Sequence, residues 1–159
     1  MPSMEGDALL IGIGTFGIGT AGFAAVAASL RSESKLWTPA HSLRVRVIVS
    51  TSFNVAFESV VPVIAALILG NMHSAVVVAS LITGINVLWI VAFRGWQVVH
   101  TRAIRLRPAQ VMAGTGVLSL ALFLLNAALF VSVGVYALAM CFQLGTAAVS
   151  FYSLIADTT

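Results

Sequence analysis

One acidic residue, Glu58, lies close to the middle of a long apolar stretch and is the residue most suited to chemistry. The other four acidic residues fall outside such stretches: Glu5, Asp7, Glu33 and Asp157. A carboxylate at the depth of a bilayer is costly, and such residues usually face a bundle interior or a water-filled cavity. Glu58 therefore either binds a proton or cation, or is a neutral carboxyl that only joins helices.

The residues around Glu58 are compatible with the first alternative. Ser50, Asn54 and Glu58 recur every four residues, so they share one face of a helix. Pro62 lacks the N–H that would otherwise bond the backbone carbonyl of Glu58, four residues earlier. The same position thus offers a carboxyl and a freed carbonyl. With Asn86 from the next apolar stretch, these residues form our candidate ion or proton site.

The second alternative needs a polar partner on a neighbouring helix. Asparagine and glutamine side chains commonly join helices within membranes, and threonine does so as well. The sequence offers four candidate partners and does not choose among them: Thr83, Asn86, Asn126 and Gln143.

Other kinds of site are not expected. His41, His73 and His100 stand on different segments, which argues against a shared metal site. The apolar stretches contain no lysine for a Schiff base, and no Ser-His-Asp set can be placed at one membrane depth. We therefore predict no catalytic, cofactor-binding or metal-binding residue and no cofactor.

The composition indicates that the chain lies in a lipid bilayer. Its 159 residues are 60% hydrophobic and 8% charged, and the mean hydropathy is +1.06. A soluble domain carries about 25% charged residues. The basic pI of about 9.8 comes from Lys and Arg residues in two short clusters between the apolar stretches. Basic residues do not alternate with aromatic ones, as they would on a surface that binds nucleic acid. We expect a lipid-facing protein that binds no nucleic acid.

The apolar stretches predict an all-α, polytopic bundle of transmembrane helices forming a single transmembrane domain over residues 1–159. A span takes about 20 apolar residues. The 49 uncharged positions between Arg107 and Asp157 suit two helices joined near Ser132–Val133–Gly134. If that hairpin re-enters instead of crossing, the count falls to four. The five predicted spans are 8–30, 45–69, 75–93, 110–131 and 135–155.

The second helix has clear end signals. Thr38 and Pro39 predict its N-cap and first residue, and Gly70 predicts its stop after Leu69. A helix of this length exceeds the bilayer thickness. Its first turns are therefore expected at the interface, with Arg44 and Arg46 extending towards water. Cys141, the only cysteine, is expected to be a small buried thiol.

The basic residues predict the orientation in the cell (cytoplasmic) membrane. All eight fall in or beside the loops after the first and third spans, and cytoplasmic loops of membrane proteins are enriched in Lys and Arg. A multi-pass topology with the N-terminus outside follows, with both basic loops and the C-terminus cytoplasmic.

The stretch "GIGTFGIGTAG", residues 12–22, contains two overlapping copies of the glycine pattern of dinucleotide sites. That interpretation needs a preceding strand and an acidic residue about 20 positions on, and the context supplies neither. As a helix, Gly12, Thr15, Gly19 and Gly22 fall within an arc of about 80°. Small residues let neighbouring backbones approach closely. We predict a helix-packing surface and assembly into a homo-oligomer or a larger membrane complex.

Two segments resemble known groups of membrane proteins. Residues 37–62, "WTPAHSLRVRVIVSTSFNVAFESVVP", resemble the second-helix region of a group of small uncharacterised bacterial polytopic membrane proteins. The segment "ESVVP" resembles part of the N-x-x-E-x-x-x-P motif of MAPEG membrane enzymes, although Asn54 stands four residues before Glu58 instead of three. The MAPEG resemblance implies an enzyme in which Arg44 or Arg46 with Glu58 binds glutathione or a lipid-like substrate.

The function expected from the sequence is that of a helical subunit of a membrane assembly, with a candidate cation or proton site at Glu58. The MAPEG-like enzyme is the alternative, and an enzymatic activity is the less expected of the two.

Overall fold

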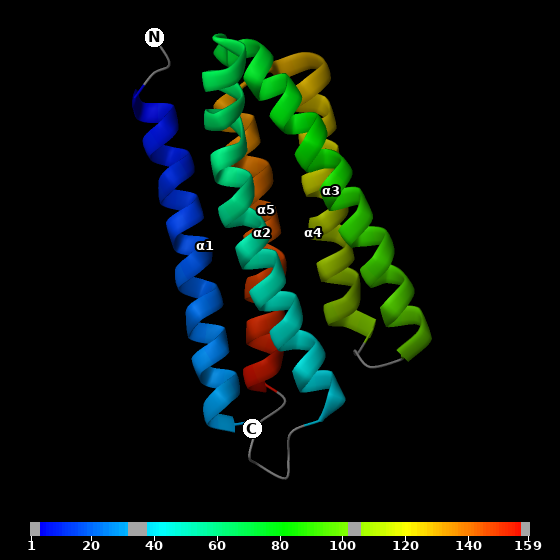
Figure 1. Cartoon of the computed structure of the whole chain (residues 1–159). Helices are drawn as coiled ribbons and strands as arrows, with labels where there is room; N and C mark the ends of the chain where they lie inside the picture. Colours follow the sequence, from blue (N-terminus) through cyan, green and yellow to red (C-terminus); the bar gives the residue numbers. More distant parts are fainter. Residues whose placement is uncertain (1–3, 32–37, 102–105, 157–159) are drawn as a thin grey trace.

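The computed structural model describes residues 4–31, 38–101 and 106–156, and nearly all of them are helical. The helices lie side by side in one elongated bundle (Figure 1). Their bounds are α1 Met4–Arg31, α2 Pro39–Leu69, α3 Met72–Thr101, α4 Leu106–Leu125, the short π-helix η1 Asn126–Phe130, and α5 Val133–Ala156.

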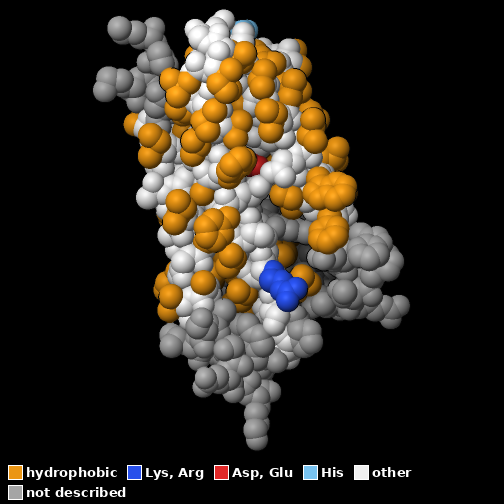
Figure 2. Space-filling view, viewed as in Figure 1, with side chains coloured by type: hydrophobic (Ala, Val, Ile, Leu, Met, Phe, Trp, Pro, Cys, Tyr) orange, Lys and Arg blue, Asp and Glu red, His pale blue; other side chains and the backbone are white. Residues whose placement is uncertain are grey.

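The prediction of five spans in an all-α bundle is confirmed, and the four-span alternative is not realised. Within the described residues, five helical stretches are long and apolar enough to cross a membrane: Ala8–Val26, His41–Leu69, Met72–Phe93, Gln110–Phe130 and Val133–Leu154. Apolar side chains cover much of the face of the bundle that Figure 2 shows. Many large ones are exposed, and Phe57 is 71% exposed. Such a surface suits contact with lipid, and the chain is a small multi-pass integral membrane protein.

The ends of α2 lie where the sequence places them. The Thr38 side chain accepts a hydrogen bond from the backbone N–H of His41, and the His41 ring accepts one from the Thr38 N–H at 3.1 Å. Gly70 ends the helix at φ 66°, a left-handed conformation that favours glycine. Pro62 lies within the helix without ending it.

The hairpin between α4 and α5 is built on Asn126. The backbone N–H of Val131, at φ 46°, donates to the Asn126 carbonyl, and the Ser132 N–H donates to Asn126 Oδ1, both at 2.8 Å. Asn126 Nδ2 donates to Ser80 Oγ on α3 at 2.9 Å. The predicted turn near residue 132 is confirmed, and Asn126 serves that turn instead of contacting Glu58.

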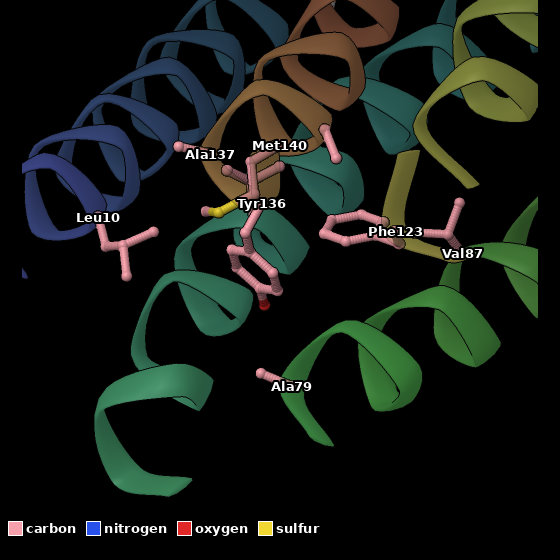
Figure 3. Close-up of a cluster of buried hydrophobic side chains, with 9 residues drawn as sticks. Leu10, Ala79, Val87, Phe123, Tyr136, Ala137 and Met140 are labelled. Carbon is pink, nitrogen blue, oxygen red and sulfur yellow. The ribbon is translucent and has the colours of Figure 1, made fainter. Parts of the chain in front are cut away.

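Helix α2 packs against α1, α3 and α5. Eight of its buried residues follow alternating steps of three and four, which is the spacing of a coiled-coil seam, and Val47, Ser52 and Ser59 are buried beside them. This seam contains His41, Arg44, Ile48, Thr51, Val55, Glu58, Pro62 and Ala65. Next to it, the apolar core gathers around Tyr136 and Phe123, whose rings meet edge to face at 5.1 Å (Figure 3).

Two expectations about single residues were wrong. Arg44 does not extend towards water: it is 2% exposed and donates from Nη1 to the Ser153 carbonyl on α5 at 3.1 Å. Arg46, about half a turn further, is exposed as expected. Cys141 is exposed on the outside of α5, because that face of the helix borders a shallow groove beside α1.

The glycines of α1 divide between an inner and an outer face. A Cβ at Gly17 would lie 2.8 Å from the Ser52 carbonyl oxygen, and one at Gly14 would collide with the Ser59 side chain. Gly12, Gly19 and Gly22 face open space and are exposed. The contact of α1 with α2 therefore uses Gly14 and Gly17, and the predicted packing face points away from the bundle.

Replacing Gly17 with leucine is expected to destabilise the protein, because the added side chain would overlap the backbone of α2. Overpacking of this kind costs about 1–3 kcal/mol. Thermal unfolding in detergent measures the loss. The matched control is Gly114→Leu on the exposed side of α4, for which no atom lies in the way. Equal melting temperatures for the two variants would contradict the close approach of α1 to α2.

Candidate functional site

The carboxyl group of Glu58 is enclosed in the bundle, at 1% exposure, and is held by three side-chain amides. Asn54 Nδ2 donates to Oε1 at 2.6 Å, and Asn86 Nδ2 donates to the same oxygen at 3.3 Å. Gln143 Nε2 donates to Oε2 at 2.6 Å. The polar centre consists of these four residues, Asn54, Glu58, Asn86 and Gln143.

The amides of the polar centre also bond one another. Asn86 Nδ2 donates to Asn54 Oδ1 at 2.7 Å, and Asn54 Nδ2 lies 3.4 Å from Gln143 Oε1. Because Asn54 and Glu58 come from α2, Asn86 from α3 and Gln143 from α5, the network joins three helices. Of the four candidate partners that the sequence offered, the structure brings Asn86 and Gln143 to the Glu58 side chain.

Every hydrogen bond to the Glu58 carboxyl comes from an N–H group. An ionised carboxylate only accepts hydrogen bonds, whereas a protonated one must also donate. The arrangement therefore suits the ionised form, and hydrogen bonds to a charged group are shorter and stronger than neutral ones. The chemistry open to such a group is the uptake and release of one positive charge.

The backbone carbonyl of Glu58, which Pro62 leaves without its helical partner, is not free. Tyr136 on α5 donates its hydroxyl to this oxygen at 2.9 Å and also lies 2.8 Å from Thr83 Oγ1 on α3. The sequence indicated the freed carbonyl, but we expected that oxygen to be available to an ion. Tyr136 was not among the candidate residues, although a freed carbonyl in an apolar interior requires a donor.

Ser50 is not brought to the polar centre. Its hydroxyl donates to the Val47 carbonyl of its own helix at 3.4 Å, and the side chain is exposed. Eight residues of helix turn Ser50 by about 80° from Glu58 and separate the two residues by about 12 Å along the axis.

Buried polar side chains continue from the polar centre towards both ends of the bundle. On α5, steps of three and four place Gln143, Thr146, Ser150 and Ser153 on one buried face. The hydroxyls of Thr146 and Thr115 of α4 hydrogen-bond at 2.7 Å, and the backbone carbonyl of Ser153 accepts from Arg44 Nη1. Towards the other end lie the pairs Tyr136–Thr83 and Asn126–Ser80. The polar face of α5 was not predicted from the sequence, although its spacing would have revealed it.

The MAPEG-like alternative would place Arg44 or Arg46 together with Glu58 around an anionic ligand. Arg44 precedes Glu58 by 14 residues, which corresponds to about 21 Å along the helix. Amide groups and apolar side chains fill the space around Glu58. Of the histidines, His41 caps the start of α2 and His73 lies exposed beside the turn after its other end. The side chain of His100 lies outside the described residues.

Comparisons with protein-family models, with curated proteins and with solved structures found no match for this chain. Its function is therefore inferred from the geometry of the polar centre.

Replacing Tyr136 with phenylalanine is expected to lower stability by about 1–3 kcal/mol, because the Glu58 carbonyl is left buried without a donor. In a Pro62→Ala background most of that loss should disappear, since the restored backbone N–H can bond the carbonyl. A double-mutant cycle of detergent unfolding free energies measures the coupling.

The matched control is Tyr152→Phe, which removes the hydroxyl of the exposed tyrosine on the same helix. It should leave stability unchanged in both backgrounds. Additive effects of Tyr136→Phe and Pro62→Ala would contradict the assigned role of Tyr136.

Proposed function

We propose that this protein binds a single positive charge, a proton or a monovalent cation, at the polar centre and moves it across the cell membrane in the manner of a channel or carrier. The observation that carries the proposal is the Glu58 carboxylate, enclosed deep in the bundle and held by amides from α2, α3 and α5.

The carboxylate is difficult to explain by packing alone. Side-chain amides join helices within membranes without introducing a charge. Asn54, Asn86 and Gln143 could link the three helices with a fourth neutral residue at position 58. An ionisable group at this depth adds a cost, which is the usual mark of an ion or proton pathway. A monovalent charge balances the carboxylate, whereas a divalent ion would leave an excess charge in an apolar interior.

The buried polar residues on both sides of the polar centre support a pathway along the bundle. The polar face of α5 leads towards Arg44, and the Tyr136–Thr83 and Asn126–Ser80 pairs lead towards the α4–α5 hairpin. A path built this way supplies hydroxyl and amide groups within the apolar core, where a bare charge is otherwise costly.

The orientation completes the proposal. The end of α1, the start of α2, the end of α3 and the start of α4 lie at one end of the bundle (Figure 1). The basic residues of the sequence fall in or beside these segments. We place this end on the cytoplasmic side because short cytoplasmic loops are rich in Lys and Arg. The N-terminus then faces outward.

Replacing Glu58 with glutamine is expected to reduce ion flux by at least about tenfold. The variant keeps the shape of the side chain but loses interactions with a charged group worth about 1.5–3 kcal/mol. Flux is measured with the purified protein in liposomes, under an imposed proton or cation gradient. The matched control is Phe57→Leu, which changes the neighbouring residue on the outer side of α2. Undiminished flux in Glu58→Gln would contradict the proposal.

Assembly into an oligomer is a second feature that we propose, supported by the outer face of α1. Gly12, Gly19 and Gly22 leave that face open, since no atom lies within 4 Å of the position a Cβ would take. Beside Gly12, an apolar groove of ≈ 520 Å³ runs between α1 and α5. Glycine faces of this kind allow close helix contact within membranes.

Replacing Gly19 with leucine is expected to shift the protein from oligomer to monomer while the fold of each chain is retained. The leucine would hold a second helix away from α1. Mass measurement of the detergent-solubilised protein reports the oligomeric state, and circular dichroism reports the fold. Thr20→Ser is the control on the adjacent position. An unchanged oligomer would show that assembly does not use this face.

A further inference from the structure

We infer that the charge bound by Glu58 is a proton, and that Gln143 is the amide that turns over to accept a hydrogen bond from the protonated carboxyl. This inference rests on the proposed function, in which Glu58 binds a single positive charge. Two features support it: the contacts of the carboxyl, and the hydrogen bonds that each amide would lose by turning.

A metal ion would find few oxygen ligands at the polar centre. Cations such as Ca²⁺ and Mg²⁺ are held by carboxylate, carbonyl and water oxygens. Here the Asn54 Oδ1 atom already accepts from Asn86, and the Glu58 backbone carbonyl accepts from Tyr136. The carboxyl oxygens face amide nitrogens at 2.6 Å, which leaves no room for an ion between them. Several of these bonds would have to break together.

A proton requires a smaller change. It adds to one carboxyl oxygen of Glu58, the negative charge is cancelled, and the new O–H becomes a donor that needs an acceptor. The carboxyl oxygen that carries the proton then faces an amide, and the two donors cannot face each other. Rotation of that amide by half a turn about its last side-chain bond replaces the nitrogen with an oxygen. The hydrogen bond is restored with its direction reversed.

Gln143 is the amide that loses least by turning. Its oxygen accepts only the long contact from Asn54 Nδ2 at 3.4 Å. Asn86 would lose its 2.7 Å bond to Asn54 and bring two oxygens together. Asn54 would lose the 2.7 Å bond that it accepts from Asn86 and bring two nitrogens together. Gln143 alone contacts Oε2, so protonation of Oε2 leaves the bonds at Oε1 in place.

Other titratable groups lie away from the carboxyl oxygens. Tyr136 of α5 contacts the backbone carbonyl of Glu58 and does not bond its side chain. On α2, Arg44 is about 21 Å along the helix. On the outside of α5, Cys141 faces the groove beside α1. Among the described residues of α1, α3 and α4, none with a titratable side chain contacts the polar centre. Glu58 therefore takes up the proton itself.

The first experiment compares ions in liposomes that contain the purified protein. Proton movement is followed with a trapped pH dye, and Na⁺ and K⁺ movement with ion-selective dyes, for the wild type and Glu58→Gln. We expect proton flux that Glu58→Gln reduces at least tenfold, and no Glu58-dependent Na⁺ or K⁺ flux. Glu58-dependent Na⁺ or K⁺ flux would overturn the proton inference and leave the proposed function standing. The absence of any Glu58-dependent flux would overturn the proposed function itself.

The second experiment observes the carboxyl directly by infrared difference spectroscopy between acidic and alkaline buffer. We expect a carbonyl band of a protonated carboxyl that is absent in Glu58→Gln and unchanged by Na⁺ or K⁺. In Gln143→Leu the band should move to higher frequency, because the acceptor of the new O–H is gone. In Asn86→Leu, the matched control, it should stay in place. A band that moves in Asn86→Leu and not in Gln143→Leu would overturn the role of Gln143.

Discussion

The arrangement of the bundle depends on the burial of the Glu58 carboxyl among three amides. A charge within an apolar interior is tolerated only when its hydrogen bonds are complete. Asn54 lies beside Glu58 because both residues are on α2. Asn86 and Gln143 reach the carboxyl only if α3 and α5 pack against α2 at the right depth and rotation. The relative depth and rotation of these three helices are therefore coupled to one side chain. A shift by one residue in α3 or α5 would remove a donor and leave the carboxyl exposed to hydrocarbon.

Proline at position 62 adds a second constraint at the same place. It removes the helical partner of the Glu58 carbonyl, and the Tyr136 hydroxyl supplies the missing bond from α5. The hydroxyl is held in turn by Thr83, and the ring packs against Phe123. The side chain and the backbone of one residue thus fasten α2 to α5 through Gln143 and Tyr136. This explains why α2 stays helical through a proline within the membrane.

The sequence predicted the helices well because each signal is local. Charge-free length predicts a span, Thr38–Pro39 predicts a start, and Gly70 predicts a stop, without knowledge of neighbouring helices. Asn54 was placed beside Glu58 for the same reason. The inward burial of Arg44, the role of Tyr136 and the choice of Asn86 and Gln143 depend on how helices rotate against one another. The rotation of a helix about its own axis is weakly encoded in the sequence when nearly every face of the helix is apolar. These contacts could therefore be identified only in the structure.

The contact between α1 and α2 has a mechanical consequence. At Gly17 the backbone of α1 lies directly against the backbone of α2, and Gly14 lies against Ser59, the residue that follows Glu58. Most helix contacts are cushioned by side chains that can change rotamer and absorb small displacements. At Gly17 no side chain lies between the two helices, and at Gly14 only the short side chain of Ser59 does. A displacement of α2 near Glu58 would therefore have to displace α1 as well, because little room is left between their backbones.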